Sequence, residues 1–453
     1  MSMRHSISHT SRPSVFLALL VLLFAALALA GGSYRSDAPG QVVVRFVAGI
    51  MFVVGVLTVP RPVAENRGPF LLLAAIALVP LVQLVPLPPA WWKILPGRGA
   101  LAHAIEGIGQ DPVWRPLSWS PGTTLNALFS LIVPAAMLLL MAGVKQRERG
   151  WLLGLFLAMV AGVALVGLIQ FSGNRFDQPL IRYDNQVSGV FANRNHFALF
   201  LALGCLATPA WALSDKRKAS VSVPVGIGLI IVLALTILAS GSRAGMAMAG
   251  IAIAIGPLVV REDIRRLISG WPRWLAPVIA IGMLALLAGA VALSASAGRA
   301  QAIDRLITAD VSSDMRARSL PTVLSMTHTY FPAGIGMGSF DVAFRHHEPF
   351  ALLKLTYFNQ AHDDVLSVIL EGGLPGLIVL VMATVWWARG SMMVWPARAY
   401  DGALVRARLG SAMLAFVFAA SIVDYPARTP TIMAVVALAS AWLSWGWYSV
   451  RRP

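Results

Sequence analysis

Residues 223–260 read VPVGIGLIIVLALTILASGSRAGMAMAGIAIAIGPLVV, and Arg243 is the one charged residue among them. An α-helix rises about 1.5 Å per residue, so each apolar run beside Gly241-Ser242 comes close to crossing a hydrocarbon core of about 30 Å. Helices of water-soluble proteins rarely stay apolar on every face over such a length. This stretch therefore predicts two membrane-spanning helices joined by a tight hairpin.

The composition of the whole chain agrees with this interpretation. Hydrophobic residues make up 57% of the 453 positions and charged residues 12%. Soluble domains carry about 25% charged residues, so this chain has too few to cover a surface that faces water. The net charge of +16 does not indicate nucleic-acid binding, because the basic residues cluster in short segments between apolar runs. The single cysteine, Cys205, cannot form an intramolecular disulfide.

Similar apolar runs recur along the chain and predict about twelve spans. Their approximate ranges are 14–32, 41–59, 69–87, 123–144, 150–171, 190–212, 223–240, 243–260, 274–294, 364–386, 409–424 and 431–449. The expected fold class is therefore all-α, a polytopic transmembrane helix bundle. Ala28-Leu29-Ala30 resembles a signal-peptidase site, but we expect an uncut signal anchor because eleven more spans follow.

Lysine and arginine in the short connections predict the orientation of the spans. With residues 1–13 as a cytoplasmic N-terminus, the cytoplasmic segments hold 20 of the 36 basic residues. These are Arg4, Arg12, Arg61, Arg67, Lys145, Arg147, Arg149, Lys216, Arg217, Lys218, Arg261, Arg265, Arg266, Arg273, Arg389, Arg398, Arg406, Arg408, Arg451 and Arg452. Both termini are then cytoplasmic.

Two segments on the predicted outer side are long. Residues 88–122 carry four tryptophans, which suit a segment at the lipid interface. Residues 295–363, between spans nine and ten, hold four of the eight histidines and six basic residues. A loop of this length in a compact protein is usually functional. We expect it to include short helices around 298–308 and 314–328.

Arginines on the predicted outer side are candidates for binding a diphosphate. Arg243 lies in the hairpin, Arg316 in the long loop and Arg194 at the start of span six. Guanidinium groups stay charged and bind phosphate oxygens in a bidentate fashion. The alternative is that each arginine reaches lipid headgroups or caps a helix.

His362 is the candidate acid or base, in Asn359-Gln360-Ala361-His362-Asp363-Asp364 just before span ten. An imidazole can accept a proton from a hydroxyl near neutral pH. The alternative is a hydrogen-bonded histidine at the interface. We expect Asp363 and Asp364 to cap the helix, and Glu371 to anchor the site rather than to act in catalysis.

Other chemistries have little support in the sequence. It contains no Cys/His or His-Glu set at metal-binding spacing, no Walker loop and no dinucleotide fingerprint. We therefore expect no metal or other cofactor and no cytoplasmic nucleotide-hydrolysing domain. The donor is expected to arrive already activated, on a lipid.

Four segments resemble, in the same order, motifs of the O-antigen ligase and polymerase family. GVFANRNHFA (189–198) is similar to its Gly-x-Phe-x-Asn-x-Asn segment, and SGSRAG (240–245) to its Ser-Arg hairpin. DMR (314–316) with FPAGIGMGSF (331–340) resembles its arginine and Pro-x-x-Gly-x-Gly loop. AHDDVLSVILEGGLPG (361–376) resembles its His-Asn helix start, with Asp363 in place of the usual asparagine. The family-like core spans 189–386.

The resemblance implies a fold like that of the C-type glycosyltransferases and a particular organisation of the chain. Residues 14–294 would form spans one to nine, 295–363 a periplasmic loop with catalytic residues, and 364–449 spans ten to twelve. The protein would lie in the bacterial inner membrane with its active site on the periplasmic face.

The implied activity is metal-independent transfer of a glycan from undecaprenyl diphosphate to an acceptor hydroxyl, on lipid A core or similar. By motif, Arg243 and Arg316 would hold the diphosphate and His362 would activate the acceptor or steady the leaving group. Further expected substrate contacts are Arg194, Asn195, Arg318, Arg345 and Asn359, with Asp363 and Glu371 in support. The alternatives are a polymerase of lipid-linked O-antigen or exopolysaccharide repeats, and a polysaccharide or lipid transporter without chemistry.

Overall fold

The computed structural model describes residues 14–35, 38–59, 65–109, 113–173, 180, 186–267, 269, 272, 274, 315–353, 358, 360–398 and 402–451. The expected cytoplasmic N-terminus at 1–13, the expected helix at 298–308 and Asn359 lie outside these residues. The ninth predicted span, 274–294, lies outside them apart from Trp274.

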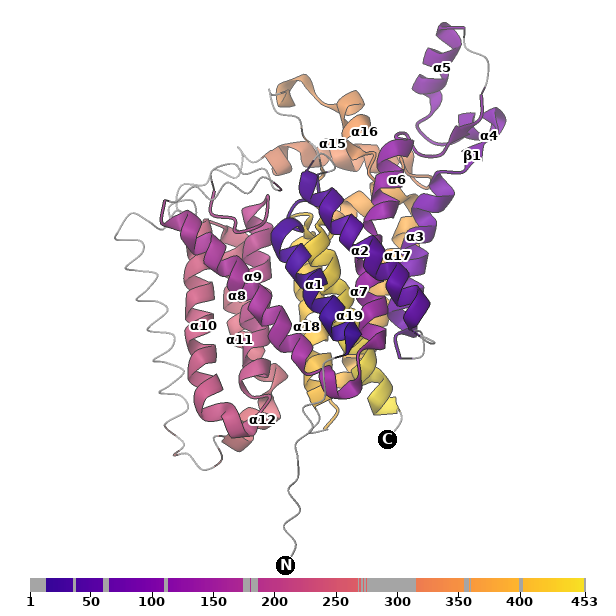
Figure 1. Ribbon diagram of the computed structural model, residues 1–453. Coiled ribbons are helices and arrows are strands. Elements are labelled where there is room, and N and C mark those ends of the chain that lie inside the picture. Colours follow the sequence, from indigo (N-terminus) through magenta and orange to yellow (C-terminus); the bar gives the residue numbers. More distant parts are fainter. Residues whose placement is uncertain are drawn as a thin grey trace, which may run out of the picture.

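Helices dominate the described residues (Figure 1). The first half contains α1 (Val15–Ala30), α2 (Pro39–Thr58), α3 (Arg67–Gln83), β1 (Pro86–Leu87), α4 (Pro89–Lys93), α5 (Gly99–Gly107), β2 (Arg115–Pro116), α6 (Pro121–Ser130), α7 (Ile132–Gly143), η1 (Gln146–Glu148), α8 (Trp151–Phe171), α9 (Arg194–Ala212) and η2 (Lys216–Lys218). The second half contains α10 (Ala219–Ser240), α11 (Arg243–Val259), α12 (Arg261–Leu267), α15 (Met315–Tyr330), α16 (Phe340–His347), η4 (Phe350–Leu352), α17 (Asp364–Val394), α18 (Gly402–Ser421), η5 (Pro426–Arg428) and α19 (Pro430–Arg451).

The polytopic all-α fold is confirmed. Eight helices of the described chain are long and apolar enough to cross a membrane, and the pair α11 and α12, bent by 71°, forms a ninth candidate. The two shorter apolar helices, α1 and α3, coincide with the first and third predicted spans. Eleven of the twelve predicted spans therefore correspond to helices, and the remaining one is 274–294.

Helix α9 lies at the centre of one half of the bundle, where it packs against α8, α10, α11 and α18. Its residues from His196 to Thr208 are all buried, which leaves little of its surface for lipid. By contrast, α2 and α10 expose valine, leucine and isoleucine side chains on their outer faces. A helix that is apolar all round is stable in either setting, so only packing separates the two kinds.

The connections between helices gather at two opposite ends of the bundle. At the end that carries α12, the backbone N–H of Ser14 donates to Glu148 at 2.9 Å, and Arg408 pairs with Glu262 at 2.6 Å. At the end that carries α15, the N–H groups of Ala192 and Thr431 donate to the carbonyls of Gly32 and Gly31. Successive connections therefore alternate between the two ends, as the predicted order of spans requires. Which end faces the periplasm remains a prediction from the basic residues.

A lobe stands on the α15 end of the bundle (Figure 1). It consists of residues 86–109, 113–119 and 315–353, and we call it the outer lobe. The antiparallel pair β1 and β2 closes its first part, while Tyr330, Phe340 and Phe344 belong to a separate apolar core in its second part. Helix α15 coincides with the predicted helix at 314–328.

The outer lobe packs onto a break in α17. Gly373 interrupts that helix with φ 60° and ψ −148°, a conformation that side chains other than glycine rarely adopt. The loop over residues 331–339 fits against this break, where Gly336 N–H donates to the Glu371 carbonyl at 3.0 Å. Leu374 N–H in turn donates to the Pro332 carbonyl at 2.8 Å. The glycine-rich motifs of the loop and of α17 are therefore two sides of one contact.

Candidate active site

Asp424 is the centre of a polar cluster at the α15 end of the bundle. It follows the last turn of α18, and only 4% of its surface is exposed. Its Oδ2 atom accepts from Asn195 Nδ2 at 2.8 Å and from Arg316 Nη2 at 3.3 Å. Its Oδ1 atom accepts from the backbone N–H of Tyr425 at 3.0 Å. A buried carboxylate needs such partners, because burial of an unpaired charge is strongly unfavourable.

Two histidines approach the same oxygen of this carboxylate. His362 Nδ1 lies 3.6 Å from Asp424 Oδ1, and His196 Nε2 lies 3.7 Å from it. His362 stands at the turn before α17 with φ +53°, a left-handed conformation that is uncommon for residues other than glycine. Such outliers cluster at functional sites, where the surrounding structure maintains them.

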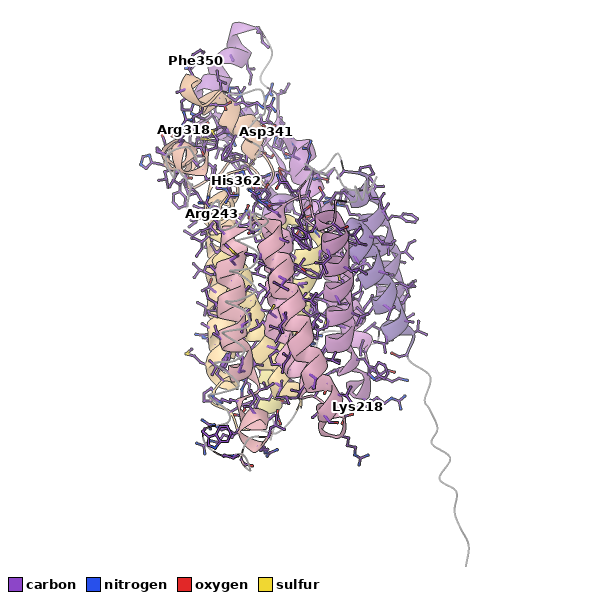
Figure 2. All side chains as sticks on the ribbon, turned by 90° about the vertical axis from the view of Figure 1, so that its left-hand side faces the viewer. Lys218, Arg243, Arg318, Asp341, Phe350 and His362 are labelled. Carbon is purple, nitrogen blue, oxygen red and sulfur yellow. The ribbon has the colours of Figure 1, made fainter. Side chains whose placement is uncertain are left out.

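The two expected diphosphate-binding arginines come from different helices. Arg316 is the second residue of α15 and also donates to the carbonyl of Val423 at 3.1 Å. Arg243 is the first residue of α11, and its exposed guanidinium makes no hydrogen bond or ion pair with another described residue. Figure 2 shows that Arg243 and His362 both lie at one end of the bundle, with Lys218 at the other.

A short chain of hydrogen bonds joins the start of α11 to the carboxylate. Ser242, the N-cap of α11, accepts from Gly245 N–H and donates its hydroxyl to Asn195 Oδ1 at 2.8 Å. The same Asn195 amide then donates to Asp424. Because both ends of this amide are engaged, its orientation is fixed, and the position of Arg243 is tied to that of Asp424.

A cavity of about 220 Å³ opens beside this cluster. At one part of its wall stand polar side chains, namely Asn195, His196, Arg316 and Asp424. The rest of the lining is apolar and comes from α9, α11 and the end of α18, including Leu199, Ala247, Met248 and Ala420. The cavity therefore suits a ligand with a charged part and a hydrocarbon part.

A second, buried ion-pair network supports the turn that carries His362. Glu371, which is fully buried, pairs with Arg428 Nη2 at 2.9 Å and accepts from the Phe340 N–H at 3.2 Å. Arg428 Nε also lies 3.4 Å from Asp364 Oδ1. Asp364 therefore contacts η5 with its side chain rather than capping its own helix, which corrects the expectation for that residue. The N-cap of α17 is Asp363, whose Oδ1 accepts from Leu366 N–H at 2.9 Å.

Asp424 follows the end of α18 and Asp363 precedes α17, and their surroundings shift their pKa values in opposite directions. Burial alone would raise the pKa of Asp424, but the contacts from His196 and His362 and the charge of Arg316 hold it well below its usual range. Burial raises the pKa of Asp363, and the backbone N–H groups that bind its carboxylate counteract this only in part. Asp424 is therefore a permanent anion near neutral pH.

The structure brings together some of the predicted site residues. His362, Arg316 and Asn195 meet at Asp424, Arg243 is joined to them through Ser242, and Asp363 and Glu371 flank the His362 turn.

Two other predicted residues, Arg318 and Arg345, have their partners on the outer lobe. Arg318 donates to the Ala351 carbonyl at 2.9 Å, and Arg345 forms a bidentate pair with Asp341 on the outer lobe. Arg194 is the half-buried first residue of α9.

Sequence reasoning missed Asp424, His196 and Arg428. Asp424 and Arg428 lie in Asp424-Tyr425-Pro426-Ala427-Arg428, the short connection between the last two spans. The sequence offered one indication of these two residues. Asp424 ends a predicted span, and the basic Arg428 follows it within four residues on the predicted outer side. Among the described residues, no three His, Cys, Asp or Glu side chains are placed to hold a metal ion.

Residues 227–381 match the sequence profile of a family described as O-antigen ligase. The matched stretch begins within α10 and ends within α17, so it includes Arg243, Arg316, His362 and Glu371. Asn195, His196 and Asp424 lie outside it. No curated protein matches the chain.

Proposed function

We propose that the chain, whose residues 227–381 match the O-antigen ligase family, acts as a member of that family and transfers a glycan from undecaprenyl diphosphate to an acceptor hydroxyl. The observation that carries the proposal is the convergence of Arg316 and His362 on the buried carboxylate of Asp424, beside a cavity with a polar part and an apolar part. The inner membrane as location, and the periplasmic face as the side of the reaction, belong to the same proposal and rest on the basic-residue distribution.

The donor is proposed to bind with its diphosphate at the arginines and the start of its lipid along the apolar wall. Arg243 is exposed and Arg316 is about one third exposed, so both guanidinium groups can reach a ligand. Each offers a planar fork that fits phosphate oxygens. Their charge also stabilises the diphosphate as it leaves, which is where negative charge develops.

His362 is proposed to activate the acceptor. We assign the proton of the neutral imidazole to Nδ1, which lies 3.6 Å from Asp424 Oδ1, and this leaves the lone pair of Nε2 to accept the proton of the acceptor hydroxyl. The hydroxyl oxygen then forms a bond to the anomeric carbon while the bond from that carbon to the diphosphate oxygen breaks. Undecaprenyl diphosphate leaves with the electron pair, and His362 carries the proton. Asp424 would orient the ring and stabilise the imidazolium that forms.

The outer loop, 295–363, is proposed to supply part of this site, because Arg316 lies in its described part and His362 at its end. Transport without chemistry fits less well. Carriers bind their substrates near the bilayer midplane, whereas this polar cluster lies at the end of the bundle (Figure 2). Lipid A core or a similar molecule is the proposed acceptor.

Deletion of the gene followed by analysis of surface and lipid-linked glycans tests the proposal. Finished polymer that stays on the lipid without attachment to its acceptor would support the ligase. Single lipid-linked repeats without polymer would instead identify a polymerase. Unchanged glycan on both the lipid and the acceptor would remove both functions.

A further inference from the structure

We propose that His196 is a positioning residue that controls the proton affinity of His362 through the carboxylate they share, Asp424. The proposal rests on the function above, in which His362 takes up the proton of the acceptor. It gives a role to a buried imidazole that lies outside the family match.

The geometry places both imidazoles on one oxygen atom. His196 Nε2 and His362 Nδ1 lie 3.7 Å and 3.6 Å from Asp424 Oδ1, whereas Asn195 and Arg316 bind the other oxygen, Oδ2. The two rings are therefore in similar positions with respect to one negative charge. The two imidazoles therefore share one carboxylate oxygen instead of each having a separate one.

Tyr425 keeps the two rings in place. Its ring contacts His196 with a centroid distance of 5.1 Å and His362 with one of 4.8 Å, both edge to face. Tyr425 is itself buried and packs edge to face against Tyr34 at 4.9 Å. Because one rigid side chain contacts both imidazoles, neither ring can turn away from Asp424 without repacking the other.

The charges around His196 make its protonation matter to His362. Asp424 and Arg316 face it directly, Asp364 interacts with it through space, and Arg243 begins the neighbouring α11. Helices α8 and α10, which also pack against α9, contain no ionisable side chain. A proton on each imidazole would put three cations, with Arg316, around the single carboxylate Asp424. The second proton is therefore disfavoured by the first.

This coupling has a direction. A proton held at His196 repels a proton at His362, so it keeps His362 neutral, and able to accept a proton, at lower pH. His196 is 1% exposed and its Nδ1 atom has no hydrogen-bond partner among the described residues. Its ring also forms part of the cavity wall, so a bound diphosphate would favour its charged form.

The test is the pH–rate profile of His196→Gln, measured by single-turnover transfer in nanodiscs. Glutamine can still donate to Asp424 but cannot carry a proton. The acidic limb should move to higher pH by about 0.5–1 unit. The variant should therefore lose more of its rate at acidic pH than at alkaline pH. His328→Gln, which removes an exposed histidine from α15, is the matched control and should leave the limb unchanged. A uniform loss of rate without movement of the limb would overturn the proposal.

A second measurement does not depend on transfer or on the variant. Titration of the ring ¹⁵N signals of His196 and His362 in the wild-type protein should give curves that depend on one another, each with two steps. Independent single-site curves would overturn the coupling. The transfer rate of His362→Ala separates this result from the proposed function. If the curves are coupled but His362→Ala retains full transfer, the coupling stands and the proposed function of His362 is wrong.

Discussion

His362 Nδ1 lies 3.6 Å from Asp424 Oδ1, although the two residues are far apart in the sequence and precede and follow different spans. A backbone hydrogen bond of 3.3 Å from Asp364 N–H to the Asp424 carbonyl joins the same two turns. The start of α17 and the end of α18 are therefore held together next to the imidazole. Hydrogen bonds at catalytic sites are often long without substrate and shorten when it binds.

Asp424→Asn should reduce the rate of transfer by about 10²–10⁴-fold. The amide keeps the shape of the carboxylate but removes the charge that orients His362 and pairs with Arg316. The measurement is single-turnover transfer by protein whose abundance and thermal unfolding are followed in parallel. Asp341→Asn, which breaks an exposed pair with Arg345, is the control and should retain activity. Equal rates for the two variants would exclude a role for the Asp424 charge.

Arg243→Ala and Arg316→Ala should each abolish transfer while the protein remains near its normal abundance. Each change removes one of the charge-assisted contacts proposed to hold the diphosphate, worth about 1.5–3 kcal/mol in binding. Arg243→Lys should restore little activity, because an ammonium group cannot replace a planar fork. Arg217→Ala, an exposed arginine at the α12 end, is the control for loss of positive charge. Full activity of both alanine variants at Arg243 and Arg316 would identify them as headgroup contacts.

His362→Ala should lower the rate by about 10²–10⁴-fold with donor binding retained. The pKa of Asp424 lies well below its usual range, so this carboxylate stays ionised from about pH 5.5 to 8.5. Its contribution to stability is complete above the pH at which an unfolded aspartate titrates, about 3.9, and is lost only below it. An unchanged rate for His362→Ala at every pH would leave arginine electrostatics as the whole mechanism.

Asp363→Asn should retain substantial activity, because asparagine can also accept the Leu366 N–H that Asp363 binds as N-cap. The raised pKa of Asp363 means that its ionised form is disfavoured in the folded protein. This destabilisation of the wild-type protein is absent below the pKa of aspartate in the unfolded chain and grows as pH rises above it. The asparagine variant should therefore gain stability relative to wild type toward neutral pH. The measurement is thermal unfolding at about pH 3.5, below the unfolded pKa, and at about pH 7, alongside the transfer assay. A shift of the acidic limb to lower pH would show instead that Asp363 tunes His362.

Gly373→Ala should destabilise the protein by about 1–3 kcal/mol. Its φ is +60°, and an added Cβ atom would lie 2.2 Å from the Pro332 carbonyl oxygen. Gly372→Ala is the matched control, because the nearest atom to its Cβ would be Met337 Sδ at 3.6 Å, an ordinary contact. Thermal unfolding of the two variants in the same detergent should separate them by several degrees. Similar midpoints would mean that the contact between the outer lobe and α17 does not require this conformation.

Cysteine labelling in a Cys205→Ala background should reach position 345 from the periplasm and position 218 only after permeabilisation. Arg345 and Lys218 are both well exposed and stand on parts at opposite ends of the bundle, so each cysteine should be accessible on its own side. An impermeant maleimide on intact spheroplasts makes the measurement. Labelling of position 345 from the inside alone would reverse the predicted orientation.

The sequence by itself determined the bundle and the end at which its polar residues gather. Length and hydropathy of an apolar run are local properties, so α2, α10 and α19 could be predicted without knowledge of their neighbours. Because successive spans reverse direction, their alternation also placed Arg243, Arg316 and His362 at a common end. The hairpin at Gly241-Ser242 followed from the same pattern, and α11 begins at Arg243.

Only the tertiary structure decided which side chains meet. Asp424, His196 and His362 come from three separate connections, and their approach depends on how α9, α17 and α18 are rotated and packed, for which a single sequence holds no local signal. The partners of Arg345 and Arg316 also depend on the tertiary structure, because both are arginines of the same predicted loop. Arg345 is bound by Asp341 on the outer lobe, whereas Arg316 reaches the buried carboxylate of Asp424. The difference arises because α15 starts against the end of α18, while α16 lies within the outer lobe, and this placement follows from the packing of the loop at 331–339 on the break at Gly373.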